Sequence, residues 1–133
     1  MSQENVEVLR QVTEAINRGD REAWLLLQDP EVEFRADPEW PEAETVRGRD
    51  AVWAFVADIV EAWEPADFEM GEVIDAGSDR LLVRLTRPVR GKKSGIADVL
   101  DYWCVFTFRG GKILRTHWFA TRDQALEAVG LSK

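Results

Sequence analysis

The second half of the chain constrains the fold most, because it consists of consecutive strand-like segments joined by short turns. Runs rich in aromatic and β-branched residues extend over 68–76, 81–89, 96–109 and 112–120. The turns between them contain glycine, and the shortest is the pair at 110–111. Short connections join antiparallel neighbours, so the sequence predicts an antiparallel sheet built from these strands.

Helical periodicity dominates the first half of the chain. Apolar residues recur at helical spacing over 3–18 and 49–63, and a shorter helix is predicted over 21–27. One alternating segment, 31–37, predicts a half-buried strand, and a last short helix is predicted over 122–129. Helices gathered before an antiparallel sheet define the α+β class, in which the two long helices must cover the inner face of the sheet.

Composition limits the function classes. The chain has 133 residues, which suits one domain over 1–133, and a net charge of −8, which disfavours binding to nucleic acid. One cysteine and one histidine argue against a disulfide framework and against a metal site, and no cofactor is expected. The acidic N-terminus lacks the apolar region of a signal peptide, and no apolar run is long enough to span a bilayer. We therefore expect a cytoplasmic protein without a membrane partner.

Several short segments carry a resemblance to a known family by their order and spacing. They are Asn-Arg-Gly-Asp at 17–20, Asp-Pro-Glu-Val-Glu-Phe at 29–34, Arg-Gly-Arg-Asp-Ala-Val at 47–52, Val-Phe-Thr-Phe at 105–108 before Gly-Lys-Ile at 111–113, and Arg-Asp-Gln-Ala-Leu-Glu-Ala at 122–128. In this pattern the chain resembles the SnoaL-like proteins of the NTF2-like superfamily. The resemblance implies a cone, in which a curved, mostly antiparallel sheet wraps around helices and encloses an apolar pocket. It also implies a homodimer formed through the outer face of the sheet.

The resemblance implies two functions of different classes. The superfamily includes ketosteroid isomerases, limonene epoxide hydrolases, scytalone dehydratases and polyketide cyclases, which implies an apolar, cyclic small molecule as ligand and cofactor-free isomerisation, cyclisation, dehydration or hydrolysis. It also includes members without chemistry, which implies a non-catalytic module for ligand binding or dimerisation. Since a fold does not determine an activity, both functions stay open at this point.

The parity of the strands identifies candidate pocket residues. Successive side chains of a strand point to opposite faces, and the more apolar set should face the helices. In the last strand that set is Leu114, Thr116 and Trp118. With aromatic residues from the first half of the chain, the predicted ligand-binding residues are Trp24, Phe34, Trp40, Tyr102, Cys104, Phe106 and Trp118.

The opposite register would place a different pair inside the pocket. Asp101 and His117 would then point inward and could act as acid and base, since histidine titrates near neutral pH. Under the favoured register both lie outside. The steroid-isomerase pattern has a carboxylate base and a buried acid about where this chain has Phe34 and Cys104, so that chemistry is not supported. The catalytic residues are left open.

Overall fold

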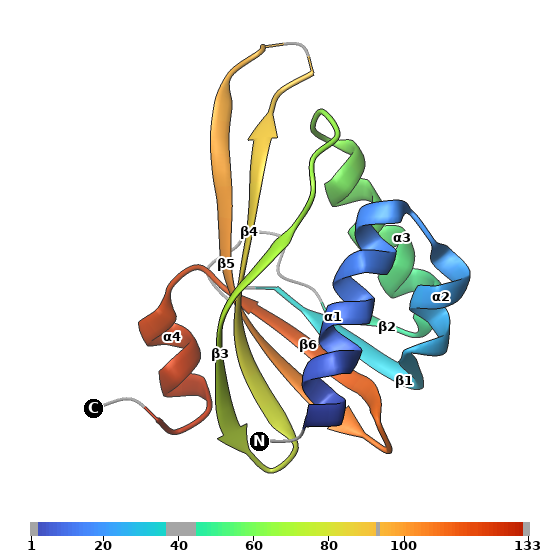
Figure 1. Ribbon diagram of the computed structural model, residues 1–133, viewed down its shortest axis with the longest axis vertical. Helices are drawn as coiled ribbons and strands as arrows, with labels where there is room; N and C mark the ends of the chain where they lie inside the picture. Colours follow the sequence, from blue (N-terminus) through green and yellow to red (C-terminus); the bar gives the residue numbers. More distant parts are fainter. Residues whose placement is uncertain (1–2, 37–44, 93, 132–133) are drawn as a thin grey trace.

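A computed structural model describes residues 3–36, 45–92 and 94–131 (Figure 1). Its elements in chain order are α1 (Gln3–Arg18), α2 (Arg21–Leu26), β1 (Gln28–Arg35), β2 (Val46–Arg47), α3 (Arg49–Glu61), β3 (Glu69–Gly77), β4 (Arg80–Arg90), β5 (Ala97–Arg109), β6 (Lys112–Phe119) and α4 (Arg122–Ala128). The strands form one sheet in the order β2-β1-β6-β5-β4-β3. Every neighbouring pair is antiparallel except β1 and β6. The predicted α+β class with a curved, mostly antiparallel sheet is confirmed.

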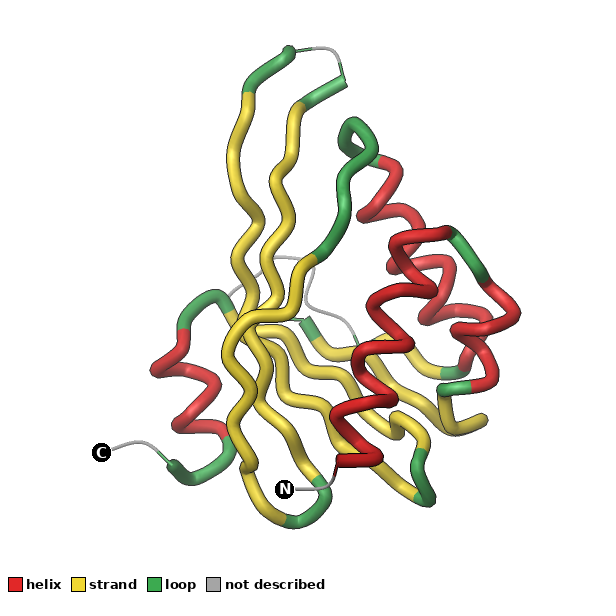
Figure 2. Tube along the Cα trace, in the orientation of Figure 1, coloured by secondary structure: helices red, strands yellow, loops and turns green. Residues whose placement is uncertain are grey.

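The two faces of the sheet are covered differently. Helices α1, α2 and α3 lie together over one face, here called the concave face, whereas α4 lies on the opposite, convex face (Figures 1 and 2). Strands β4 and β5 extend beyond the other strands as a long hairpin arm (Figure 1). The larger apolar core fills the space under the three helices, and a smaller apolar cluster lies beneath α4.

The middle of strand β5, over residues 103–106, is buried on both sides of its pleat. Cys104 and Phe106 belong to the core of the concave face, while Trp103 and Val105 belong to the cluster beneath α4. The strand therefore alternates between two apolar environments rather than between protein and water. The favoured parity of the sequence is the one that the structure adopts.

Helix α1 is held to the sheet by its apolar stripe and by one polar clamp. Leu9, Val12 and Ala15 are its buried apolar residues, at the spacing of one helical face. Near the end of the helix, the side-chain amide of Asn17 donates to the carbonyl of Phe68 over 3.0 Å and accepts from its backbone N–H over 2.8 Å. This clamp joins the end of α1 to the segment that leads into β3.

Three elements differ from the prediction by more than one residue. β1 begins at Gln28, three residues before the predicted start, and it contains Pro30. The register with β6 shifts between Gln28 and Glu33, so no ladder bond requires the missing N–H of Pro30.

Strand β2 was not predicted, because a segment of two residues is too short to show a period. α3 ends at Glu61, and the predicted loop over 38–45 lies mostly outside the described residues.

A bulge also reverses part of the parity predicted for the last strand. The register between β5 and β6 shifts after the pair Thr107 and Arg115, so that Phe108 lies opposite Ile113. Ile113 is therefore fully buried in the concave core, where parity alone would place Leu114. Beyond the bulge, Thr116 and Trp118 keep the predicted orientation.

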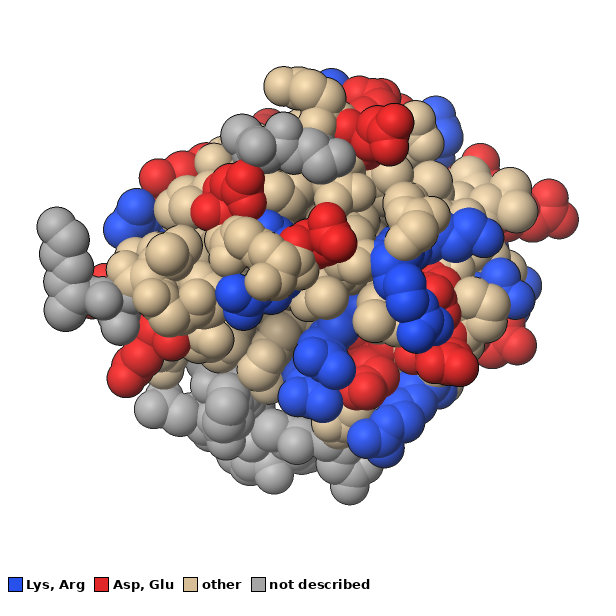
Figure 3. Space-filling view, turned by 90° about the horizontal axis from the view of Figure 1, so that it is seen from below, with Lys and Arg blue, Asp and Glu red and all other residues tan. Residues whose placement is uncertain are grey.

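An ion pair joins the start of β1 to the end of β5. The guanidinium of Arg109 donates to both carboxylate oxygens of Asp29, over 3.0 Å from Nε and 2.8 Å from Nη2, and reaches Glu31 over 3.3 Å. Seen from below, basic and acidic side chains lie against one another in this way (Figure 3). The bonds from Arg109, with one from the backbone N–H of Glu31, lower the pKa of Asp29.

Replacing Asp29 with Asn should therefore destabilise the fold near neutral pH, by about 1 kcal/mol for a partly exposed pair. The pKa of Asp29 is lower in the folded chain than the unfolded value of about 3.9. Its contribution is therefore present above that value and is lost as the pH falls through the folded pKa. Urea unfolding of both forms between pH 7 and pH 2 should show a difference in stability that shrinks toward low pH. Asp58→Asn, on an exposed position of α3, is the control, and equal loss at all pH values would contradict the assignment.

Candidate functional site

A small internal cavity lies between the concave face and the helices. Its volume is about 40 Å³, which is room for one water molecule rather than for a ring. The residues that line it come from α1, α2, α3 and the inward faces of β1, β4, β5 and β6, and they include Val12, Trp24, Val52, Phe34, Phe106 and Trp118. A ligand larger than water must displace some of these side chains.

Gln28 brings an amide into this apolar lining. Its side chain is 2% exposed and lines the cavity. Its side-chain amide is not among the described polar atoms that are fully buried without a hydrogen-bond partner. Because the residue borders the cavity, its amide is placed to bind a water molecule or a polar group of a ligand there. The hydroxyl of Thr116 also lines the cavity, whereas that of Thr13 donates to the carbonyl of Leu9 over 2.9 Å.

Aromatic rings surround the cavity in contact with one another. The ring of Phe34 lies 4.8 Å from that of Phe55 and 4.9 Å from that of Trp118, between centroids. Tyr102 is stacked on Trp118 at 4.4 Å. Such stacked and edge-on pairs stabilise the core beyond the burial of their area. They also present flat surfaces that suit a planar ligand.

Two titratable side chains close to the cavity, Tyr102 and Cys104, are held neutral. Burial raises the pKa of the Tyr102 hydroxyl, with a further contribution from Cys104. Burial alone raises the pKa of the Cys104 thiol well above its usual value. A thiol that is fully buried and protonated is not a nucleophile, so Cys104 acts here as a small apolar residue.

The structure places Asp101 and His117 outside the cavity. Asp101 is exposed and accepts from Nε and Nη2 of Arg84 over 3.0 and 2.7 Å, which lowers its pKa. His117 lies opposite Val105 on the convex face, and its ring is 4.1 Å from that of Phe119. The alternative register is not adopted, and neither side chain lines the cavity.

The predicted ligand-binding residues divide into three groups. Trp24, Phe34, Phe106 and Trp118 line the cavity. Tyr102 and Cys104 share the concave face with them but belong to the surrounding core. Trp40 lies outside the described residues. Gln28 was not predicted as a lining residue, because the strand was predicted to begin at residue 31. Its even number gives it the same parity as Val32 and Phe34, which is the signal that could have identified it.

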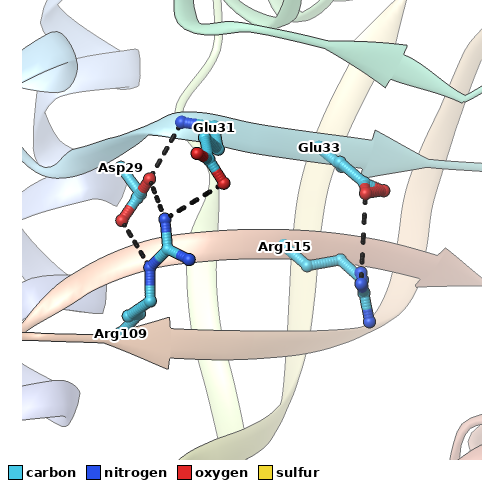
Figure 4. A network of polar contacts seen from close by, with 5 residues as sticks. All are labelled: Asp29, Glu31, Glu33, Arg109 and Arg115. Carbon is cyan, nitrogen blue, oxygen red and sulfur yellow. Dashed lines mark hydrogen bonds and ion pairs between the residues drawn. The ribbon is translucent and has the colours of Figure 1, made fainter.

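A charged cluster occupies the convex face of β1 and β6. The carboxylate of Glu33 lies 3.3 Å from Nη2 of Arg35 and 4.0 Å from Nη2 of Arg115, the latter drawn in Figure 4. The Nε atoms of both arginines are buried and have no hydrogen-bond partner in the described structure. Two guanidinium groups therefore share one carboxylate, and their Nε–H donors have no acceptor in the described structure.

The described residues contain neither a candidate metal site nor a candidate membrane-spanning helix. No group of histidine, cysteine and acidic side chains in that part of the chain has the arrangement of a metal site. Among the helices that the structure describes, none is both long and apolar enough to cross a membrane.

Comparison with known proteins identifies the fold. A family model described as a SnoaL-like domain matches residues 9–116. TerC, crystallised with polyporic acid, has a TM-score of 0.75 and 22% identity, over 96% of this chain and 99% of its own. Rv0760c from Mycobacterium tuberculosis, in complex with estradiol-17β-hemisuccinate, has a TM-score of 0.75 and 16% identity, over 92% and 97%.

A third solved structure has the same architecture. It is a hypothetical protein from Catenulispora acidiphila with a ketosteroid isomerase-like fold, in complex with trimethylamine, with a TM-score of 0.73 and 14% identity over 94% of this chain and 93% of its own. At these identities the likeness shows the fold alone. No curated protein sequence matches the chain significantly.

Replacing Gln28 with Leu should stabilise the ligand-free protein, by about 1 kcal/mol, because it replaces an amide in a mostly apolar lining with an apolar group of similar volume. Denaturant unfolding measures the change. Gln11→Leu, the same substitution on an exposed position of α1, should change the stability by less than about 0.5 kcal/mol. A clear loss of stability in Gln28→Leu would mean that the amide has a structural partner.

Proposed function

The chain belongs to the SnoaL-like domain family, and on that premise we propose that it binds an apolar, cyclic small molecule between the concave face and the helices. One observation carries the proposal: the cavity is lined by apolar and aromatic side chains, and Gln28 adds one amide to this lining. Similar structures hold small molecules, namely polyporic acid and estradiol-17β-hemisuccinate. Apolar sites with a few placed polar groups are typical of small-molecule pockets.

The ligand must open the cavity as it binds. At about 40 Å³ the space is smaller than one aromatic ring, so Trp118 and the stacked Tyr102 have to move apart. A planar ligand replaces their mutual contact with two new ring contacts. A polar group on the ligand satisfies the Gln28 amide, which offsets part of the free energy needed for the rearrangement.

Binding, rather than proton-transfer catalysis, is the function that this site supports. The polar groups in the described lining are the Gln28 amide, the hydroxyls of Thr13 and Thr116 and the indole N–H groups of Trp24 and Trp118. These groups form hydrogen bonds but do not exchange protons near neutral pH, whereas isomerases of the predicted kind need a carboxylate or an imidazole at the substrate. The proposed role is therefore that of a ligand-binding module.

Titration with 2-naphthol tests this proposal. The compound should raise the melting temperature of the wild-type protein, since a ligand at one hundred times its Kd stabilises by about 2.7 kcal/mol. Val12→Phe places a ring in the cavity and should abolish the shift. Val8→Phe, the same change at a half-buried position of α1 outside the lining, should leave it intact. Absence of any shift in the wild type, or an unchanged shift in Val12→Phe, would refute the proposal.

We also propose that two copies of the chain pair through the convex face. The observation that favours pairing is the cluster around Glu33, where the side chains of Arg35 and Arg115 share one carboxylate and are each 39% exposed. Helix α4 packs against β5 and β6, and the cluster lies on β1 and β6 of the same convex face. A second copy would supply carboxylates to the exposed parts of these two side chains.

Sedimentation measures this pairing directly. The wild type should be a dimer at micromolar concentration, and Arg115→Glu should be a monomer, because it places a second carboxylate beside Glu33. Arg10→Glu makes the same change in charge on the exposed side of α1 and should remain a dimer. A wild type that sediments as a monomer would exclude the interface.

A further inference from the structure

An arginine interrupts the apolar row on the concave side of β4. The inward-facing residues of this strand are Leu81, Val83, Leu85, Arg87 and Val89, and all of them are buried. Arg87 is 0% exposed. A guanidinium stays charged in proteins, so burial at this position is costly unless other groups compensate for it.

Two of its nitrogen atoms are used to hold neighbouring backbone. Nε donates to the carbonyl of Ala66 over 3.1 Å, and Nη2 donates to the carbonyl of Val60, in the last turn of α3, over 3.2 Å. The guanidinium also lies over the ring of Phe68 at 5.4 Å. Burial lowers the pKa of Arg87, and the charge of Asp67 opposes this. These contacts explain how the side chain anchors the end of α3.

Anchoring of the end of α3 does not account for the third guanidinium nitrogen, Nη1. Nη1 is buried and has no hydrogen-bond partner in the described structure, and no carboxylate of the described residues forms an ion pair with Arg87. The charge is therefore compensated by carbonyl dipoles, including those at the C-terminus of α3, by the ring of Phe68 and by the charge of Asp67. A buried cation with a free donor is a site where an anion would gain both a hydrogen bond and charge neutralisation.

Arg87 lies between the internal cavity and a groove that opens to solvent. Along β4, Leu85 lines the cavity and Val89 lines the groove, with Arg87 between them on the same face. Along the other wall, Val56 lines the cavity and Glu64 lines the groove, with Val60 between them. The groove has a volume of about 510 Å³ and lies against the hairpin arm of Figure 1. Arg87 itself lines neither space, so a ligand that reaches from the cavity toward the groove must displace the side chains between them to contact the guanidinium.

We propose that Nη1 of Arg87 binds an anionic group, such as a carboxylate, phenolate or enolate, on the ligand whose ring occupies the cavity. The inference rests on the proposed binding function and defines its ligand as an apolar ring that bears one acidic group. The groove itself carries Glu64 and Asp98, with Arg90 beside Glu64 at 3.6 Å. Their charges do not favour an anion at the entrance, so its stable position is beside Arg87.

A pair of ligands with the same ring isolates the effect of the charge. We expect 2-naphthoate to bind the wild type at least about tenfold more tightly than neutral 2-naphthamide, as is usual for a hydrogen bond to a charged partner. Arg87→Met should remove this preference while changing the affinity for the amide by less than about twofold. Arg84→Met, on the exposed side of β4 where it contacts Asp101, should keep it. Calorimetry measures all six combinations.

A measurement on the wild type keeps the test valid if Arg87→Met fails to fold. In protein labelled with ¹⁵N-arginine, naphthoate should shift the guanidinium resonance of Arg87, assigned by its loss in Arg87→Lys, and naphthamide should leave it unshifted. Equal affinity for the two compounds, or a preference that survives Arg87→Met, overturns this inference but not the proposed function. Failure of both compounds to bind the wild type overturns both.

Discussion

The burial of the middle of β5 on both sides is the constraint on which the rest of the structure depends. Cys104 and Phe106 face α1, α2 and α3, while Trp103 and Val105 face α4. Because side chains alternate with a period of two, a slip of one residue would exchange these sets and carry Asp101 into the apolar core. The register that buries the aromatic residues therefore also excludes charged side chains of β5 from the concave face. The apolar character of the cavity is a consequence of this exclusion.

Much of the fold follows from periodicity, and the parts that do not follow have identifiable causes. The parity of β5 correctly predicted the inward orientation of Tyr102 and Phe106, since a long strand with two apolar neighbours leaves little choice. The start of β1 was missed because Asp29-Pro30 is typical of a helix end, and a proline is tolerated in a strand where the ladder is already interrupted. The exchange of Ile113 for Leu114 required a bulge, which has no signature in this sequence.

The candidate site was harder to predict than the fold, because its two decisive residues contradict the pattern around them. Gln28 and Arg87 are polar residues at positions whose neighbours of the same parity are buried and apolar. A periodicity argument assigns such residues to solvent or ignores them. Their burial depends on how α1 and α3 pack over the sheet, which no local pattern specifies. Departures from local consistency of this kind are expected at sites that bind ligands, and here they lie at the cavity and immediately beyond it.

The parallel pairing of β1 with β6 determines when this chain can fold. Gln28 lies beside Ile113, and the ion pair between Asp29 and Arg109 joins residues 80 positions apart. The helices that precede β1 pack on a face that is incomplete until β6 has been synthesised and has added to the sheet. Closing so large a loop has a high entropic cost, and the contacts that compensate for this cost form only after the loop has closed. Trp24 and Phe34 can already contact Trp53 and Phe55 within the N-terminal half, but the face on which they pack is completed only when β6 joins β1.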